Sequence, residues 1–545
     1  MDQYDYIVVG AGSAGCAVAR RLSDDPALGV LLLEAGGPSD GFWNRTPAGV
    51  ARLHKSEQFN WNYMTLPVSG LRDRTIYWPA GKALGGSSAI NGMVYIRGDR
   101  RDFDNWAKLG NPGWGWDDVL PYFRRSETNA RGSSAVHGGD GPLHVTNPAI
   151  VHPTVVDFIR AAEMCGLPRR TDFAFGEQEG SGTVQYTIRN GERHSSYRAY
   201  IEPVRDRPNL VVETGAHVCR ILFRERTATG VELIQGGQKR TIFANREIIL
   251  SAGALRSPHL LLLSGVGDGR QLQNHGVPLV AHLPGVGRNL QDHLTVRVQA
   301  ETNRLSSYNR DLRGWRKYWQ GARYVLTKGG YLALGTSSAA AFFKSSASVE
   351  YADVEISFRP MTFTAHPSGK VEVDGYDAIS GSVYRVRPAS RGQVGLASPN
   401  PLDAPSIQPN YLGAPEDLEA TVAGIRVLRQ ILSTEPLASR IRKEIVPGSI
   451  ADTNEKLADY VRRDAASVFH PAGTCKMGND DMAVVDSNLR VRGIERLRVI
   501  DASIMPVVTS GNTNAPTIMI GEKGADLVRS ERLVPQEREA LAPTT

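Results

Sequence analysis

Two segments near the C-terminus contain the residue types best able to move a proton and to hold a developing charge. One is FHPAGTCKMG at 469–478, which contains His470, and the other is SGNTNAPTIMI at 510–520, which contains Asn514. A neutral imidazole accepts a proton near pH 7, and an amide N–H group stabilises an oxygen on which negative charge develops. Taken singly, however, His470 is one of 12 histidines, and Asn514 is typical of a turn or a helix cap.

The N-terminal segment predicts an element that binds a dinucleotide. An apolar run at 6–9 predicts a buried strand, and the sequence GAGSAG at 10–15 follows it. Residues 16–22 then predict a helix, and the apolar run at 30–33 predicts a second strand. Such a β-α-β unit implies a parallel strand pair in a doubly wound α/β domain.

Each glycine of this turn has a physical role beside a pyrophosphate. Gly10 allows a tight turn, Gly12 lets the backbone approach the phosphates, and Gly15 lets the helix pack closely on the strand. The helix N-terminus offers free N–H groups and the positive end of its dipole. Glu34, 19 positions past Gly15, can accept hydrogen bonds from ribose hydroxyls and repels a 2′-phosphate. This motif alone does not choose between NAD and FAD.

A second glycine-rich segment helps with that choice. Its sequence, GKALGGSSAING at 81–92, offers small residues, hydroxyls and backbone N–H groups in a row. Such a segment can lie along an extended cofactor, although an ordinary turn is an equal alternative for the segment by itself.

The length of 545 residues is too great for one hydrophobic core, so two or more domains are expected. Apolar runs at 247–250 and 497–500 predict further strands of the first domain. Alternating polar and apolar residues at 351–359 and 380–386 predict an antiparallel sheet with one covered face. The predicted division is a first domain at 1–152, 204–300 and 467–535, a second at 153–203 and 301–466, and a frayed tail at 536–545.

The ordered set of motifs resembles the glucose–methanol–choline (GMC) oxidoreductases. The motifs are GAGSAG, GKALGGSSAINGM, SAGALRSPHLLLLSGVG, NLQDH, FHPAGTCKMG and SGNTNAPTIMIGEK, and the resemblance runs from about residue 4 to about residue 529. Within the family, the chain looks most like bacterial alcohol dehydrogenases near choline, sorbose and polyethylene glycol dehydrogenases. The resemblance implies an α/β FAD-binding domain of the Rossmann type and an α+β substrate domain whose antiparallel sheet covers the flavin.

The resemblance also implies the roles of single residues. His470 matches the catalytic base, and Asn514 matches the second active-site position, which is His or Asn in family members. Some members attach FAD covalently through a His where this chain has Ile90, so FAD is expected to be non-covalent. The matches to FAD-binding positions are Gly10, Gly12, Ser13, Ala14, Gly15, Glu34, Ala35, Gly85, Ser88, Asn91, Gly92, Val94, Val218, Ala252, Gly253, Asp501, Ala502 and Thr517.

The implied reaction is oxidation of an alcohol by hydride transfer to flavin N5, with His470 as the base. We favour a dehydrogenase that passes electrons to a quinone-like acceptor. An alcohol oxidase that uses oxygen is the alternative, and a flavin-containing hydroxynitrile lyase is a less favoured one. The alcohol and the oligomeric state stay open. No metal-ligand spacing appears, and this chemistry needs none.

Composition argues against other classes of partner. The formal charge is +6, but no long Lys/Arg run exists, so we expect no nucleic-acid partner. The four cysteines are scattered, which argues against a zinc site and a disulfide framework. Neither a signal peptide nor a membrane span is expected. These features predict a cytoplasmic protein, with peripheral contact at the inner membrane as an alternative.

One stretch at 306–335 has aromatic residues at helical spacing. The favoured interpretation is a helix that packs its apolar face on its own domain, and the alternative is a lid or a membrane-surface helix. The residues that carry this pattern are Trp315, Tyr318, Trp319, Ala322 and Leu326.

Overall fold

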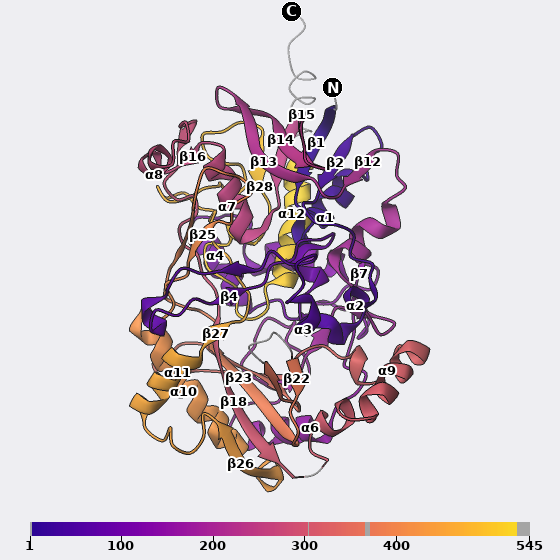
Figure 1. Cartoon of the computed structure of the whole chain (residues 1–545), viewed down its shortest axis with the longest axis vertical. Helices are drawn as coiled ribbons and strands as arrows, with labels where there is room; N and C mark the ends of the chain where they lie inside the picture. The colour runs from indigo at the N-terminus through magenta and orange to yellow at the C-terminus, as the bar shows by residue number, and fades with distance from the viewer. Residues whose placement is uncertain (1–2, 304, 366–370, 531–545) are drawn as a thin grey trace, which may run out of the picture.

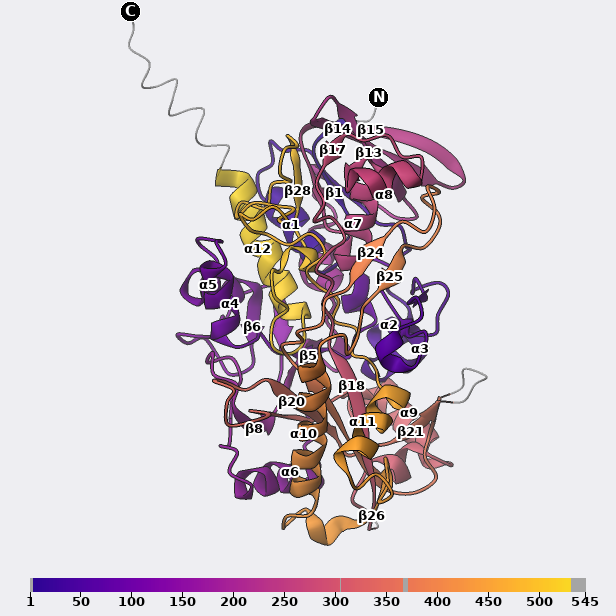
Figure 2. The ribbon, with the colours of Figure 1, turned by 90° about the vertical axis from the view of Figure 1, so that its left-hand side faces the viewer.

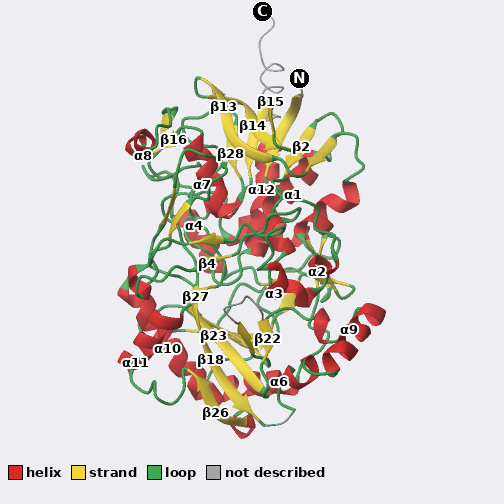
Figure 3. Cartoon of the chain, in the orientation of Figure 1, coloured by secondary structure: helices red, strands yellow, loops and turns green. Residues whose placement is uncertain are grey.

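The computed structural model describes residues 3–303, 305–365 and 371–530. The predicted tail at 536–545 lies outside these residues. The chain forms two seven-stranded sheets, which lie toward opposite ends of an elongated molecule (Figures 1 and 3). The predicted class, an α/β domain of the Rossmann type joined to an α+β domain with an antiparallel sheet, is confirmed.

The first sheet has the order β12-β2-β1-β15-β14-β13, and β28 pairs with β15. Strands β12, β2, β1, β15 and β28 run parallel, whereas β13, β14 and β15 form an antiparallel ribbon. The four strands predicted for this domain are all present. The bounds are β1 (Gln3–Val9), β2 (Val30–Leu33), β12 (Leu210–Glu213), β13 (His217–Arg224), β14 (Thr227–Gln235), β15 (Gln238–Leu250) and β28 (Leu497–Val499).

Helices cover the parallel part of this sheet, which is why its strands are apolar on both faces. Helix α1 (Ser13–Leu22) packs beside α12 (Asn514–Ser530), so an early and a late segment of the chain lie side by side (Figure 2). Gly521 permits this contact, because a Cβ atom there would lie 2.7 Å from the carbonyl oxygen of Ala14. Helix α7 (Gly253–Leu263) follows β15 directly.

The second sheet is antiparallel, with the order β26-β18-β23-β20-β19-β8, and β27 pairs with β18. Its apolar face packs against α6 (Pro153–Met164) and α10 (Pro415–Leu432), as Figure 2 shows. The bounds are β8 (Gly180–Thr183), β18 (Leu294–Thr302), β19 (Ala339–Phe343), β20 (Val354–Arg359), β23 (Ala378–Arg385), β26 (Ile441–Val446) and β27 (Ala466–Ser467).

The two sheets correct one predicted domain boundary. Strand β18 begins at Leu294 and belongs entirely to the second sheet. The predicted boundary after residue 300 therefore cuts through a strand, and the middle segment of the first domain ends before residue 294. The error arose because no turn signal separates NLQDH from the strand that follows it, so the start of the strand could not be seen in the sequence. The rest of the two-domain division stays a prediction.

The aromatic stretch forms a helix, but the favoured interpretation of its apolar face is wrong. Helix α9 (Arg316–Thr327) lies at the edge of the molecule (Figure 1). Its aromatic face is turned to solvent: Trp315 is 74% exposed, Trp319 61% and Leu326 82%. Among the described residues, no helix is long and apolar enough to cross a membrane.

Candidate active site

The residues predicted to bind the dinucleotide gather at the carboxyl ends of the parallel strands. The glycine-rich turn follows β1, Glu34 follows β2, Ala252 follows β15 and Asp501 follows β28. In an open parallel sheet this edge is where ligands bind, because loops and helix N-termini converge there.

The glycine-rich turn has the geometry that its sequence predicts. Gly10 has a φ of 102°, and a Cβ atom at Gly15 would lie 2.0 Å from the carbonyl oxygen of Gly10. A Cβ atom at Gly12 would meet nothing closer than 3.8 Å, so no protein contact requires glycine there. Gly12 caps α1 without a side-chain hydrogen bond. The first N–H groups of α1 are thus free of a side-chain cap, as an anion site requires.

Glu34 is buried beside this turn. Its carboxylate accepts hydrogen bonds from the backbone N–H groups of Ala11, at 3.1 Å, and Gly36, at 2.9 Å. Burial raises the pKa of Glu34 to about 7, and the two N–H donors oppose that rise. Ala35 follows Glu34 and is half-buried. These contacts fix the carboxylate at the end of β2, where a ribose would lie.

The second glycine-rich segment lies against the first turn. The N–H group of Gly85 donates to the carbonyl oxygen of Ala11 at 2.7 Å. The hydroxyl of Ser88 donates to the carbonyl oxygen of Gly85 at 2.5 Å. Farther along, Asn91 accepts a hydrogen bond from Arg193 at 2.9 Å, and Gly92 abuts Thr336. Val94 is buried in the short strand β5 (Val94–Tyr95). The predicted path along a cofactor is therefore continuous with the phosphate turn.

Asp501 joins the ends of β15 and β28. Its carboxylate accepts from the N–H group of Gly253 at 2.9 Å and from the hydroxyl of Ser257 at 2.5 Å. Ala252 and Ala502 are half-buried beside these groups, and Val218 is buried in β13. Thr517 lies in the first turn of α12, with its hydroxyl bonded to the carbonyl of Thr513.

His470 lies in a pair of buried histidines. Nδ1 of His470 is 3.0 Å from Nδ1 of His293, and Nε2 of His293 is 2.9 Å from the carbonyl oxygen of Val386. The carbonyl can only accept, so Nε2 of His293 carries the proton. Nδ1 of neutral His293 is then an acceptor, and Nδ1 of His470 must be its donor. Nε2 of His470 is therefore unprotonated, and its lone pair can accept a hydrogen bond or a proton.

The electrostatics keep both rings neutral. Burial lowers the pKa of His293 to about 4. Burial also holds the pKa of His470 well below its usual range, and the charge that His293 would carry lowers it further. A buried neutral imidazole with a free Nε2 is a group that can accept a proton near pH 7.

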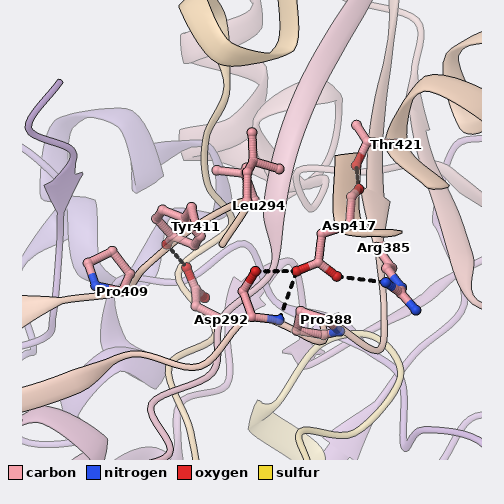
Figure 4. Close-up of a pocket in the computed structure, with 10 residues that line it drawn as sticks. Asp292, Leu294, Arg385, Pro388, Pro409, Tyr411, Asp417 and Thr421 are labelled. Carbon is pink, nitrogen blue, oxygen red and sulfur yellow. Dashed lines mark hydrogen bonds and ion pairs between the residues drawn. The ribbon is translucent and has the colours of Figure 1, made fainter. Parts of the chain in front are cut away.

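Asp292 holds the loop that carries His470. Its carboxylate accepts from the backbone N–H group of His470 at 2.7 Å and from the hydroxyl of Ser467 at 2.5 Å. It also accepts from the hydroxyl of Tyr411, as Figure 4 shows at the pocket behind the loop. Phe469, just before the base, has a φ of 66°, which is rare for a residue with a side chain. The NLQDH motif thus supplies both Asp292, which fixes the backbone, and His293, which orients the ring.

The amide beside His470 belongs to Asn512, whereas the sequence analysis assigned it to Asn514. Nδ2 of Asn512 is 3.0 Å from Nε2 of His470. Asn514 is the first residue of α12, and its side-chain oxygen accepts a hydrogen bond from the hydroxyl of Ser13 at 2.7 Å. The predicted pairing of His470 with Asn514 is wrong because α12 begins at Asn514 and directs that side chain toward the phosphate turn. Asn512 lies in the loop before the helix.

Comparisons with known proteins now identify the family. Two GMC oxidoreductase family models match residues 4–295 and 388–521. The chain belongs to the GMC oxidoreductase family. It is 41% identical to the mitochondrial choline dehydrogenase of Mus musculus over 97% of this chain and 90% of that protein. It is also 41% identical to an alcohol dehydrogenase (acceptor) of Pseudomonas putida, over 96% and 95%.

Solved GMC structures have the same fold. Pyridoxine 4-oxidase from Mesorbium loti is 31% identical and superposes with a TM-score of 0.87, covering 97% of this chain and 99% of that one. An FAD-dependent oxidoreductase from Chaetomium thermophilum is 28% identical, with a TM-score of 0.87 and the same coverage. As a GMC member, the protein is an enzyme that uses FAD and acts on CH–OH groups.

The residues present fit FAD. The free N-terminus of α1 and the open space at Gly12 suit a pyrophosphate, and Glu34 suits the adenosine ribose. The segment at 85–92 and the loop after β28 would lie along the rest of the cofactor.

Proposed function

We propose that this GMC oxidoreductase oxidises an alcohol to an aldehyde or ketone, with His470 as the base. The observation that supports this proposal best is the ordered set of hydrogen bonds from Val386 through His293 to His470 and Asn512. This set leaves one basic nitrogen, Nε2 of His470, directly beside one amide donor. FAD, when bound, accepts the hydride from the alcohol carbon.

The two side chains have complementary roles toward one oxygen atom. A substrate hydroxyl that replaces the hydrogen bond between the two side chains would donate its proton to Nε2 of His470 and accept a hydrogen bond from Nδ2 of Asn512. As the proton leaves, negative charge grows on the oxygen, and the amide N–H stabilises it. His293 holds the imidazole in the tautomer that keeps Nε2 free.

For the electron acceptor we favour a quinone-like compound over oxygen. The names of two relatives support this choice: choline dehydrogenase, and alcohol dehydrogenase (acceptor). Pyridoxine 4-oxidase, whose fold is the same, keeps an oxidase as the alternative. FAD is held without a covalent bond, because Ile90 occupies the position through which some family members attach it.

The first test is anaerobic reduction of the purified holoenzyme by a panel of alcohols. We expect the oxidised flavin absorbance to bleach, a soluble quinone to restore it quickly, and oxygen to restore it slowly. Acid precipitation should leave the yellow colour in the supernatant. An alcohol panel that never bleaches the flavin would contradict the proposed reaction, fast reoxidation by oxygen would make the enzyme an oxidase, and a yellow pellet would mean covalent FAD.

We also propose that α9 docks on an anionic lipid surface, where quinones reside. Its exposed apolar face includes Trp315, Trp319 and Leu326. Residues 309–328 contain six basic residues and one acid, so the surroundings of that face are positively charged. A short amphipathic helix with exposed tryptophans and flanking cations is suited to lie in the interface of an anionic membrane.

Vesicle co-sedimentation tests this docking. The holoenzyme should bind vesicles that contain phosphatidylglycerol better than pure phosphatidylcholine vesicles. Trp315→Ser together with Trp319→Ser should weaken binding by roughly tenfold or more, since burial of each indole contributes at least 1–2 kcal/mol. Met164→Ser, which removes an exposed apolar side chain from α6, should leave binding unchanged. Equal binding by all three proteins would overturn the assignment to α9.

A further inference from the structure

The polar face of the second sheet continues directly from the catalytic pair. His293 and Thr295 are two residues apart, and Thr295 pairs with Tyr384 of β23, whose ring lies 5.5 Å from that of His293. Tyr384 pairs in turn with Glu355 of β20. Opposite residues in neighbouring strands point to the same face. This row of three residues is therefore the part of the sheet nearest to His470.

Two arginines lie on the same face, farther from the base. Arg297 pairs with Ser382, and Arg359 pairs with Ser380, so they occupy the second and third rows. Each row adds about 7 Å along the strands. The residues that alternate with the polar ones along β18 and β20 point to the opposite face of the sheet. They belong to the apolar core under α10 and are Val296, Val298, Ile356 and Phe358.

The two arginines converge on one aromatic ring. The guanidinium carbons of Arg297 and Arg359 each lie 5.3 Å from the ring centre of Phe363. The two guanidinium carbons are therefore no farther from each other than twice 5.3 Å. Phe363 begins β21 (Phe363–Ala365), which packs over this part of the face. Contact with the same aromatic ring keeps both cations in one small region of the sheet face.

Neither guanidinium has an acidic partner. Across the described ranges, the guanidinium groups of Arg297 and Arg359 make no ion pair and no hydrogen bond; the hydroxyl of Tyr460 donates only to the backbone carbonyl of Arg297. The only acid in the three rows is Glu355, which lies in the row nearest His470, opposite Tyr384. Two like charges held against one ring repel each other, and a bound anion would relieve that repulsion.

The two arginines lie against the sheet face, and neither is fully buried. Burial lowers the pKa of Arg297, and burial together with the charge of Arg297 lowers the pKa of Arg359 to about 9. Arg297 nevertheless remains exposed to solvent, and Arg359 is half-buried.

We propose that Arg297 and Arg359 form an anion subsite for the substrate. The substrate is then an alcohol with a carboxylate or phosphate at its far end, held so that its hydroxyl reaches His470. This inference rests on the proposed alcohol oxidation and names its substrate class. A quaternary ammonium alcohol such as choline is disfavoured, because its cation would face two others.

The experiment compares alcohols that share the same hydroxyl end and differ in the charge at the far end. Anaerobic reduction of the holoenzyme is measured with ω-hydroxycarboxylates of four to eight carbons, their neutral amides, matched ω-hydroxyalkyl phosphates, and choline. At the best chain length, the wild-type enzyme should prefer the anion to the amide by about 10- to 100-fold, the worth of a charged hydrogen bond. The carboxylate and phosphate arms show which oxyanion fits, and choline should react poorly.

Two variants and one control connect this preference to the arginines. Arg297→Met and Arg359→Met should each abolish most of the preference while reduction by the neutral amide stays within about twofold. Arg442→Met removes an exposed arginine from β26 of the same sheet and should change nothing. Hexanoate, which has no hydroxyl, should perturb the flavin spectrum of the wild-type enzyme and of Arg442→Met. It should not perturb the spectrum of Arg297→Met or of Arg359→Met.

The outcomes separate the two proposals. The anion subsite is wrong if anionic and neutral alcohols reduce the flavin equally fast. It is also wrong if the Arg297 and Arg359 variants lose activity with the amide and with the carboxylate equally. In both cases the proposed alcohol oxidation stands. If no alcohol of any charge reduces the flavin, the proposed function fails. FAD content, measured for each variant, shows whether a loss comes from misfolding.

Discussion

His470→Ala should slow flavin reduction by alcohol by about 10²–10⁴-fold, the usual worth of general-base catalysis. The hydroxyl proton must leave because an alkoxide gives up hydride far more readily than a neutral alcohol. Nε2 of His470 is the unprotonated nitrogen, and among the described residues only the amide of Asn512 donates a hydrogen bond to it. FAD content should stay near the wild-type value. Stopped-flow reduction without oxygen is the measurement, and His275→Ala, on α8 (Gly269–Asn274) at its C-terminal end, is the control.

The pH dependence of flavin reduction provides a second test of His470. The base works only as the neutral ring, which predominates above its pKa. Because burial holds the pKa of His470 well below its usual range, reduction should reach its plateau below pH 6.5 and decline only toward acid. Glu355, whose pKa is raised to about 7 by burial, could add a second titration, which Glu355→Gln would remove. A wild-type rate and profile in His470→Ala would mean that another group takes the proton.

Asn512→Ala should slow reduction by about 10²–10³-fold, as loss of one donor to a developing oxyanion does elsewhere. Its Nδ2 atom lies 3.0 Å from Nε2 of His470, whereas the side chain of Asn514 is bonded to Ser13. Asn514→Ala is therefore the matched control: it should leave the reduction rate unchanged and weaken FAD retention instead. Anaerobic rates and FAD dissociation are measured for both. The reverse pattern would restore the assignment of the sequence analysis.

The parts of the fold that could be predicted depend on local pattern. The strand, turn and helix at 6–22 are adjacent in sequence, and their glycines and apolar residues act on near neighbours. The strand β28 could be predicted because an apolar run ends in small residues. The proposed base, His470, followed from a motif. Its orienting partner, His293, ends the NLQDH motif 177 positions away, but the sequence of that motif does not reveal that its histidine contacts His470.

Two errors show where local pattern fails. Asn512 and Asn514 are two residues apart at a loop–helix junction, and a shift of two residues in the helix start decides which of them faces the base. The face of α9 carries apolar residues at helical spacing, but spacing does not tell whether that face meets the protein or the solvent. Similarly, Arg297 and Arg359 look like ordinary strand residues until the register of three strands places them on one face.

The contact between α1 and α12 has a consequence for how the enzyme is made. Ser13 and Asn514, which meet at 2.7 Å, are 501 positions apart, so the ribosome adds nearly the whole chain before the partner of the phosphate turn exists. At about 5–20 residues per second this delay is roughly 25–100 s. During that time the N-terminal β-α-β unit can form from local signals, but the side of α1 that α12 will cover stays open to other apolar surfaces. We therefore expect the covered side of α1, and with it the completed phosphate turn, to form only after the last helix has been made.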